Sequence, residues 1–213
     1  MKTTSLLAEF QWTTPGPANG SSGEGLCESV VNTVRALDGI QSICDLGCGN
    51  GFIAGRLASL GYNVTGVDVS KSGLQIARQT HPSLEFVEGA IDANLAERLG
   101  HGGFDLILSS DVIEHLYRPA DLLEAASRLL KPRGRLVITT PYHGYLKNLA
   151  IAVTGKMDTH FSALHDGGHI KFFSVKTLTQ LMTSYAFTDI HFTYYGRAPW
   201  LWKNMVCSAR KAD

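Results

Sequence analysis

The chain has 213 residues, of which 44% are hydrophobic and 18% are charged. This is enough apolar material to bury one sizeable core. Nineteen Lys and Arg residues balance nineteen Asp and Glu residues, so the formal net charge is zero. Without a basic excess there is no field to gather phosphate backbones or anionic lipid. Composition therefore argues against a nucleic-acid partner.

Apolar runs along the chain are short. The run over residues 149–153 falls well short of the about 20 residues that a membrane helix requires, so we expect no transmembrane segment. The N-terminus reaches Glu9 before a signal-length apolar stretch can develop. Four cysteines occur without a CxxC pair and suit reduced, buried side chains. We therefore expect a cytoplasmic protein.

The first predicted elements lead into a glycine-rich turn. Residues 11–25 concentrate Pro, Gly, Ser and Asn, which favour turns over packing, so we predict a flexible N-terminal segment over 1–25 and one domain over 26–213. Apolar residues recur at helical spacing up to Gly39, where glycine can end a helix. An apolar run over 40–46 then predicts a strand, and helical spacing resumes from Phe52.

Strands and helices continue to alternate through the middle of the chain. Strands are predicted over 63–69, 84–87, 104–109 and 136–140, and helices over 70–80 and 119–130. Such alternation calls for a parallel sheet that is covered by helices on both faces.

The last third of the chain has a different pattern. Residues 142–172 hold histidines and aromatic residues without a strand pattern, which indicates an inserted cover. A helix that begins after Ser174 follows. Two alternating runs, 188–195 and 202–209, then predict an antiparallel hairpin at the C-terminus.

The turn after the first strand reads DLGCGNG and begins at Asp45. Glycines at alternate positions let the main chain turn sharply and let a ligand approach it closely. Phe52 stands where the dinucleotide fingerprint needs its third glycine, so NAD is disfavoured. Asp68 ends the next strand about 20 residues after Gly47, which suits a carboxylate that binds ribose hydroxyls. Together they predict a nucleoside ligand, although the glycines by themselves also fit a plain turn.

Four segments resemble the class I S-adenosylmethionine-dependent methyltransferases, in the order ICDLGCGNG, VTGVDVS, FDLILSSDVIEHL and LLKPRGRLVITTP. The resemblance covers about residues 26–210. It implies an α/β fold: a single Rossmann-like domain with a seven-stranded, mostly parallel sheet, a C-terminal antiparallel hairpin and a helical cover after strand 5. DVIEHL is similar to the motif after the fourth strand of ubiquinone-type O-methyltransferases.

The resemblance also assigns cofactor-binding roles by position. Asp45 would orient the amino group of S-adenosylmethionine, the glycines would border its methionine part, and Asp68 would bind the ribose. Many relatives carry an acid where this chain has Ala90, so the adenine contact falls to its neighbours. The expected cofactor-binding residues are Asp45, Gly47, Cys48, Gly49, Asn50, Gly51, Phe52, Asp68, Val69, Ser70, Ala90, Ile91, Asp92, Ser110, Asp111 and Val112.

Methyl transfer from a sulfonium needs an aligned acceptor and excluded water, and a hydroxyl acceptor is helped by a general base. His169 and His115 are the candidate catalytic residues. The resemblance brings His169 toward the acceptor, and His115 follows the fourth strand at the carboxyl edge, where ligands of open parallel sheets bind. Tyr142, His143 and Tyr145 are the candidate substrate contacts because the cover is apolar and aromatic. Each histidine also fits a structural role, and the cover also fits a core-packing helix.

A metal is the less favoured interpretation of the same motifs. Asp111, Glu114 and His115 match positions at which some ubiquinone-type relatives are associated with a divalent ion. Hydrogen bonding and helix capping explain these residues without a metal. Two glycines between His165 and His169 break the helix that would align a zinc site. We therefore expect no metal.

These patterns lead to one expected function. The protein is expected to move a methyl group from S-adenosylmethionine to a small apolar or aromatic molecule, most readily to a hydroxyl oxygen, with S-adenosylhomocysteine as the product. N- or C-methylation of a small molecule and a non-catalytic S-adenosylmethionine-binding module stay open as alternatives. The expected partner is the small-molecule acceptor, and a homodimer is an open alternative to a monomer.

Overall fold

The structure is a computed structural model that describes residues 10–18, 20–100, 103–161 and 163–212. Within these residues the strands form one seven-stranded sheet in the order β3-β2-β1-β4-β5-β7-β6. The first five strands pair in parallel, and β7 runs antiparallel to both β5 and β6. The strands are β1 (Ser42–Leu46), β2 (Asn63–Asp68), β3 (Glu85–Glu88), β4 (Phe104–Ser110), β5 (Leu130–Pro141), β6 (Phe187–Tyr195) and β7 (Asn204–Lys211).

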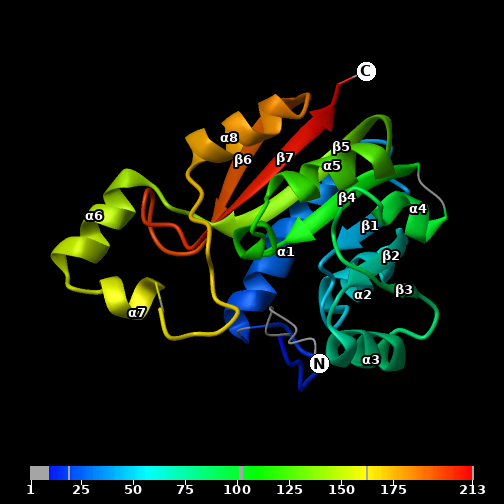
Figure 1. The fold of residues 1–213 in the computed structure, drawn as a ribbon, viewed down its shortest axis with the longest axis horizontal. Helices are drawn as coiled ribbons and strands as arrows, with labels where there is room; N and C mark the ends of the chain where they lie inside the picture. The colour runs from blue at the N-terminus through cyan, green and yellow to red at the C-terminus, as the bar shows by residue number, and fades with distance from the viewer. Residues whose placement is uncertain (1–9, 19, 101–102, 162, 213) are drawn as a thin grey trace, which may run out of the picture.

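Helices cover both faces of the sheet (Figure 1). Apolar side chains of α1, α2 and α3 pack on one face, and those of α4, α5 and α8 pack on the other. The cover helices α6 and α7 lie to one side of this three-layered body (Figure 1). The helices are α1 (Ser21–Arg35), α2 (Phe52–Ala58), α3 (Lys71–Thr80), α4 (Leu95–Leu99), the short 3-10 helix η1 (Ile113–His115), α5 (Ala120–Leu129), α6 (Tyr145–Val153), α7 (Met157–Phe161) and α8 (Val175–Ser184).

The predicted fold class is confirmed, including the helical cover and the terminal hairpin. The Ser174 hydroxyl accepts a hydrogen bond from the Thr177 amide and caps α8 as expected. Helix α1 begins at Ser21, earlier than the helical spacing predicts. Helix α4 was not predicted, because five residues carry too little periodicity to be recognised.

Strand β5 starts six residues before the predicted range, at Leu130. The sequence KPRG inside it has the composition of a turn. The strand absorbs this stretch through an irregular register opposite Phe104 and Leu106, with Arg133 at a φ of 60°. A bulge of this kind lets a strand pass through turn-forming residues.

Two features of the fold position the candidate site. The β1 and β4 strands are neighbours although β2 and β3 separate them in the chain, and ligands of such open sheets bind at the carboxyl ends of the strands around this switch point. The cover leaves and re-enters the body at one place, where the His143 amide donates to the Phe173 carbonyl at 3.1 Å. Among the described residues, no helix has the length and apolarity needed to cross a membrane.

Candidate active site

The glycine-rich loop follows β1 at the switch point. The amides of Gly47 and Cys48 both donate to the Val67 carbonyl, at 2.7 and 3.1 Å, which ties the loop to β2. Gly47 has a φ of 83°, and a Cβ there would lie 2.3 Å from Val112 Cγ2. Only glycine fits this contact. The structure therefore brings Val112, after β4, against the loop after β1.

Asp68 connects the loop to the end of β2. Its Oδ2 accepts the Gly49 amide at 2.7 Å, and its Oδ1 accepts the Ser70 amide at 2.7 Å. A carboxylate oxygen can accept more than one hydrogen bond, so these two contacts do not by themselves prevent the carboxylate from binding a ligand. Ser70 in turn caps α3 by accepting the Gly73 amide. Gly49, Asp68 and Ser70, each an expected cofactor-binding residue, thus form one hydrogen-bonded group.

Asp45 lies beneath the same loop and is only 2% exposed. Burial, and secondarily the nearby charge of Asp68, raises the pKa of its carboxyl to about 7. Its Oδ1 has no hydrogen-bond partner among the described residues. An unpaired buried carboxyl oxygen is costly in the free protein. It fits a cationic ligand group such as the ammonium of S-adenosylmethionine.

The side chains of Asn50 and Cys48 are buried and interact within the protein itself. The Asn50 amide group donates to the Thr14 and Gly16 carbonyls at 2.8 and 2.6 Å, and its Oδ1 accepts the Phe52 amide at 3.2 Å. Burial raises the pKa of the Cys48 thiol well above its usual range, so the thiol is not activated. The phenyl ring of Phe52 packs against the core on the α1 face.

The segment after β3 shows a contact that the sequence did not predict. Arg98 of α4 forms an ion pair with Asp92, with 2.9 Å between Nη1 and Oδ1, and also donates to the Ala90 carbonyl. The hydrogen bond from Arg98 lowers the pKa of Asp92. Ile91 packs against the core beside α4. Val69, at the end of β2, is 58% exposed, and its open apolar side suits a flat ring.

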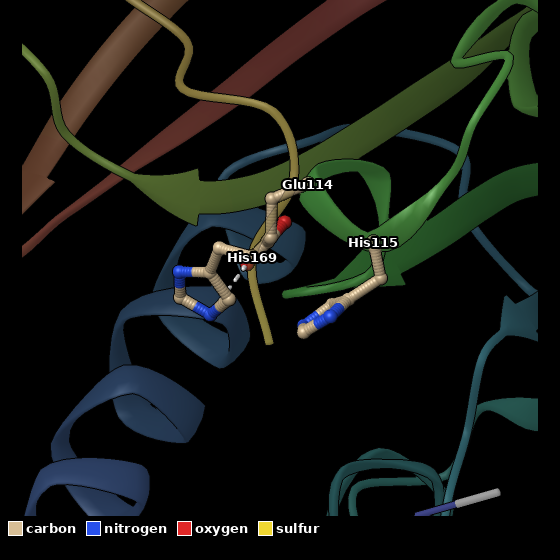
Figure 2. A group of neighbouring side chains, drawn as sticks. All are labelled: Glu114, His115 and His169. Atoms are coloured by element: carbon tan, nitrogen blue, oxygen red, sulfur yellow. Dashed lines mark ion pairs between the residues drawn. The ribbon is translucent and has the colours of Figure 1, made fainter. Parts of the chain in front are cut away.

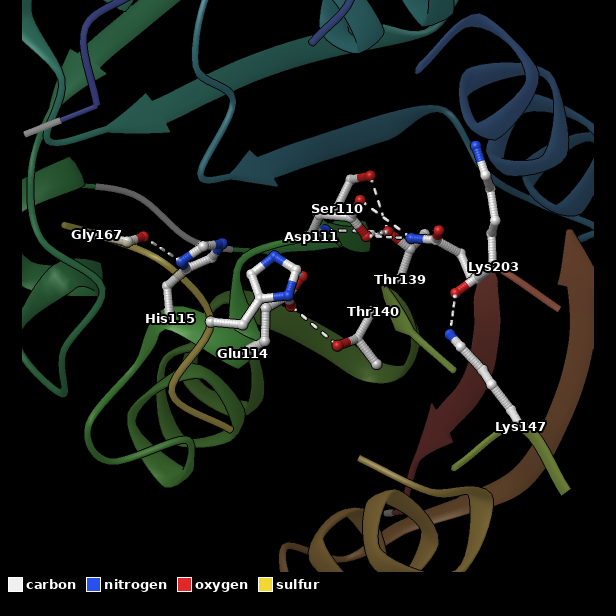
Figure 3. Close-up of polar contacts among 11 residues, drawn as sticks. Ser110, Asp111, Glu114, His115, Thr139, Thr140, Lys147, Gly167 and Lys203 are labelled. Atoms are coloured by element: carbon white, nitrogen blue, oxygen red, sulfur yellow. Dashed lines mark hydrogen bonds and ion pairs between the residues drawn. The ribbon is translucent and has the colours of Figure 1, made fainter. Parts of the chain in front are cut away.

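Ser110 and Asp111 follow β4 and join three strand ends (Figure 3). The Asp111 carboxylate accepts the Thr139 hydroxyl at 2.8 Å and the Asn204 amide at 2.8 and 3.1 Å. Ser110 bonds the same Thr139 hydroxyl at 2.9 Å. Burial raises the pKa of Asp111 to about 6, while these two hydrogen bonds lower it. Asp111 is therefore an anchor between β4, β5 and β7, and its partner Asn204 was not predicted.

The two histidine motifs are joined by main-chain hydrogen bonds. The Glu114 carbonyl accepts the amides of Ile170 and Lys171, both at 2.9 Å. The His115 ring Nδ1 bonds the Gly167 carbonyl at 2.9 Å. These contacts hold the loop before α8 against η1, so that the two candidate catalytic histidines meet. The rings of His115 and His169 lie 4.8 Å apart, edge to face (Figure 2).

Glu114 is fully buried behind these two histidines. Its Oε2 accepts the Thr140 hydroxyl at 3.0 Å (Figure 3), while its Oε1 has no hydrogen-bond partner among the described residues. Oε1 lies 3.9 Å from Nε2 of His169. Burial, reinforced by Asp111, raises the pKa of Glu114 well above its usual range and so favours the protonated form of this carboxyl. Burial lowers the pKa of His169 to about 4, so its imidazole is neutral at pH 7.

The three predicted substrate contacts lie in three different environments. Tyr142 is buried between Tyr194 and Trp202, with ring centroids 5.7 and 5.3 Å away. His143 is buried, and its neighbours are His160, Phe161 and Phe172. Tyr145 is 79% exposed on α6. The structure therefore does not bring these side chains together, and the aromatic partners on β6 and the hairpin loop were not predicted.

The predicted metal-ligand positions are separated. In the described part of the chain, Glu114 and His115 gather with His169, with ligand atoms within 4.8 Å of one another, whereas Asp111 is not part of this group. One carboxylate and two imidazoles do not fit Mg²⁺, which prefers an all-oxygen sphere. His165 and His160 do not join the group either. The interpretation without a metal stays a prediction.

Comparison with known proteins agrees with this geometry. A family profile described as a methyltransferase domain matches residues 18–191. The chain therefore belongs to the methyltransferase-domain family, and the resemblance to class I S-adenosylmethionine-dependent methyltransferases is confirmed.

Individual relatives refine the comparison. The chain is 35% identical over 116 residues to a Caulobacter protein named ubiquinone biosynthesis O-methyltransferase. The aligned stretch covers 53% of this chain and 45% of the relative. A mitochondrial protein of the same name from Arabidopsis thaliana is 36% identical over 113 residues, 51% of this chain and 34% of the relative. The matches thus span less than half the length of these relatives.

Solved structures show the same fold. An S-adenosylmethionine-dependent methyltransferase from Archaeoglobus fulgidus superposes with a TM-score of 0.69 at 16% identity, over 90% of this chain and 95% of the other. Magnesium protoporphyrin IX methyltransferase from Synechocystis, solved with bound SAH, gives a TM-score of 0.65 at 20% identity, over 88% of this chain and 82% of the other. These similarities concern the fold.

Proposed function

We propose that this protein transfers the methyl group of S-adenosylmethionine to a hydroxyl oxygen of a small aromatic or apolar molecule. The observation that carries the proposal is the hydrogen-bonded pair of Gly49 and Asp68, together with the buried Asp45 Oδ1, which has no hydrogen-bond partner among the described residues, at the sheet's switch point. Two carboxyls around a glycine loop match the two polar ends of this cofactor, its ribose and its ammonium group. The relatives named as O-methyltransferases support the same choice.

The cofactor supplies an electrophilic methyl group on a sulfonium. Asp68 would accept hydrogen bonds from the ribose hydroxyls, Asp45 would bind the ammonium, and Val69 would lie against the adenine. Ser110, Asp111 and Val112 would form the floor below the reacting centre, since they follow the neighbouring strand β4. Their role is to hold the reacting atoms in line and to keep water out.

His169 would hold the proton of the acceptor. In the transfer, a bond forms between the acceptor oxygen and the methyl carbon, the carbon–sulfur bond breaks, and its electron pair stays on sulfur. The hydroxyl proton moves to the neutral imidazole of His169. The low pKa of His169 keeps this imidazole unprotonated near pH 7, so it is available as a base.

An apolar or aromatic acceptor is favoured by the surroundings of His169. Ile170 and Phe172 follow it and are 41% and 43% exposed. Phe172 lies edge to face with Phe161, at 4.9 Å between ring centroids. Such rings bind an aromatic acceptor by stacking and exclude water.

Calorimetric titration of the purified protein with S-adenosylhomocysteine, with NADH as the negative control, tests the cofactor. We expect micromolar binding of S-adenosylhomocysteine and no binding of NADH. Transfer of label from methyl-labelled S-adenosylmethionine to a panel of phenols, quinols and amines then tests the acceptor atom. Labelled ethers support O-methylation, labelled amines or carbon-bound methyl groups replace it by another transfer, and binding without any transfer indicates a binding module.

A further inference from the structure

Residues 10–18 lie across the glycine-rich loop and the start of α3. The Phe10 carbonyl accepts the Ser70 hydroxyl at 3.0 Å, and the Trp12 amide donates to the Ser72 hydroxyl at 3.1 Å. The carbonyls of Thr14 and Gly16 both accept the amide group of Asn50. Four hydrogen bonds thus fix this segment, which we call the N-terminal strap, to the candidate cofactor site.

The indole of Trp12 is the part of the strap nearest to the loop. A Cβ at Gly49 would lie 2.3 Å from Trp12 Cζ2, and one at Gly73 would lie 2.9 Å from Trp12 Cδ1. The indole therefore rests on main chain that only glycine leaves open. The Phe10 ring packs edge to face against it, with 5.0 Å between centroids.

Gly49 links Trp12 to Asp68, the carboxylate that is proposed to bind ribose. The indole touches Gly49, and the Gly49 amide donates to Asp68. Asn50, the next residue, is 2% exposed and uses both ends of its side chain, one for the strap and one for the Phe52 amide of α2. A change in the position of the loop must therefore change the position of the strap.

We propose that Trp12 and Asn50 make the N-terminal strap a latch on the cofactor site, with Trp12 as a wall of the bound cofactor and Asn50 as the positioning residue that holds the strap closed. The proposal rests on the proposed function, because the loop and Asp68 are the proposed cofactor cradle. The strap must open for S-adenosylhomocysteine to leave, so its four hydrogen bonds slow product release. This role does not require Trp12 to touch the acceptor.

Two variants separate the latch from the fold of the loop. Asn50→Asp keeps an oxygen that accepts the Phe52 amide, but it loses both donors to the strap and places an anion beside two carbonyl oxygens. Trp12→Ala removes the wall and leaves the Asn50 contacts in place, and Trp12→Phe restores an aromatic ring. Trp200→Phe is the matched control, since Trp200 is 60% exposed in the hairpin loop.

Surface plasmon resonance on the immobilised protein, with S-adenosylhomocysteine as the probe, measures association and dissociation rates without relying on the Trp12 indole, and tryptophan fluorescence is recorded alongside. We expect the dissociation rate to rise about tenfold in Asn50→Asp and Trp12→Ala, with a smaller change in the association rate. Trp12→Phe should lie between them and the wild type, and Trp200→Phe should match the wild type. The binding-induced fluorescence change should disappear in both Trp12 variants.

Three outcomes decide the matter. Rates within twofold of the wild type in both Asn50→Asp and Trp12→Ala overturn the latch and leave the proposed function standing. Tighter binding in these variants also overturns it, because the strap would then compete with the cofactor. If the wild-type protein itself does not bind S-adenosylhomocysteine, the proposed function is wrong. Thermal unfolding of each variant, compared with that of the wild type, tests whether the fold is retained.

Discussion

Oε1 of Glu114 lies 3.9 Å from Nε2 of His169, and both groups come from motifs that are distant in the sequence. Burial raises the pKa of the Glu114 carboxyl well above its usual range, and it lowers the pKa of the half-exposed His169 imidazole to about 4. Glu114 also anchors the main chain of the residues that follow His169. Glu114 therefore both positions the candidate base and places a buried carboxyl beside it.

We expect His169→Ala to lower kcat for the identified acceptor by about 100-fold or more, as the loss of a general base does. The affinity for S-adenosylhomocysteine should change by less than about twofold, because no proposed cofactor contact is removed. Steady-state kinetics and calorimetry on the same preparation measure the two effects. His191→Ala, on the exposed face of β6, is the matched control. Unchanged turnover would leave His169 with a structural role only.

The pH dependence of turnover should follow the imidazole of His169. Because burial lowers its pKa to about 4, the base is unprotonated at neutral pH, and kcat should stay level from about pH 8 down to about pH 6. It should then fall as the pH approaches the pKa. Turnover rates over this range, corrected for unfolding, give the profile. A midpoint near the ordinary pKa of histidine, about 6.5, would contradict the burial effect.

Asp68→Ala should weaken S-adenosylhomocysteine binding by about 2 to 4 kcal/mol, since two charge-assisted hydrogen bonds to ribose are lost. Asp68 also accepts the amides of Gly49 and Ser70. Asp68→Asn retains one acceptor oxygen and should show the smaller loss. Calorimetry measures the affinities, with adenosine as a second ligand that reports the ribose contact alone. An unchanged affinity for both ligands would show that the ribose binds elsewhere.

Asp45→Asn should change stability and binding in opposite directions. The folded-state pKa of Asp45, about 7, lies above its ordinary value of 3.8, so the folded protein binds this proton more tightly than the unfolded chain does. The free energy of unfolding therefore decreases as the pH rises from about 4 to about 7. The asparagine removes this loss, which is about 4 kcal/mol at most. Urea unfolding at pH 5 and pH 8 should show a larger stabilisation at pH 8 than at pH 5, while S-adenosylhomocysteine binds more weakly.

A chelator should leave the protein unchanged. Glu114, His115 and His169 are the described groups nearest to a metal-binding arrangement, and hydrogen bonds to the Thr140 hydroxyl and the Gly167 carbonyl already engage Glu114 and His115 without an ion. We expect turnover and S-adenosylhomocysteine affinity in excess EDTA to match those after addition of Mg²⁺. A loss of turnover in EDTA that Mg²⁺ or Zn²⁺ restores would assign a metal to this group.

Local patterns explain which parts of the fold and site could be predicted. The glycine loop, Asp68 and the cap at Ser174 are encoded by a few neighbouring residues, so the sequence alone identifies them. Asp111 was expected beneath the cofactor, but its anchoring role depends on Asn204, which follows the hairpin loop. The contact of Trp12 with Gly49 likewise joins residues that no spacing rule connects. Such pairings can be predicted only when the order of the strands in the sheet is known.

The ends of the cover meet in one hydrogen bond, between the His143 amide and the Phe173 carbonyl. Lys147 reinforces this junction, because its buried ammonium donates to the Tyr142 carbonyl at 2.6 Å. It also donates to the Lys203 carbonyl at 3.4 Å (Figure 3). The junction therefore fixes both ends of the cover, while the hydrogen bonds from Ile170 and Lys171 to the Glu114 carbonyl hold its last residues against η1. Substitutions in α6 and α7, which lie between the junction and His169, can therefore change the lining of the acceptor side without moving the base or the strands that carry the cofactor loop.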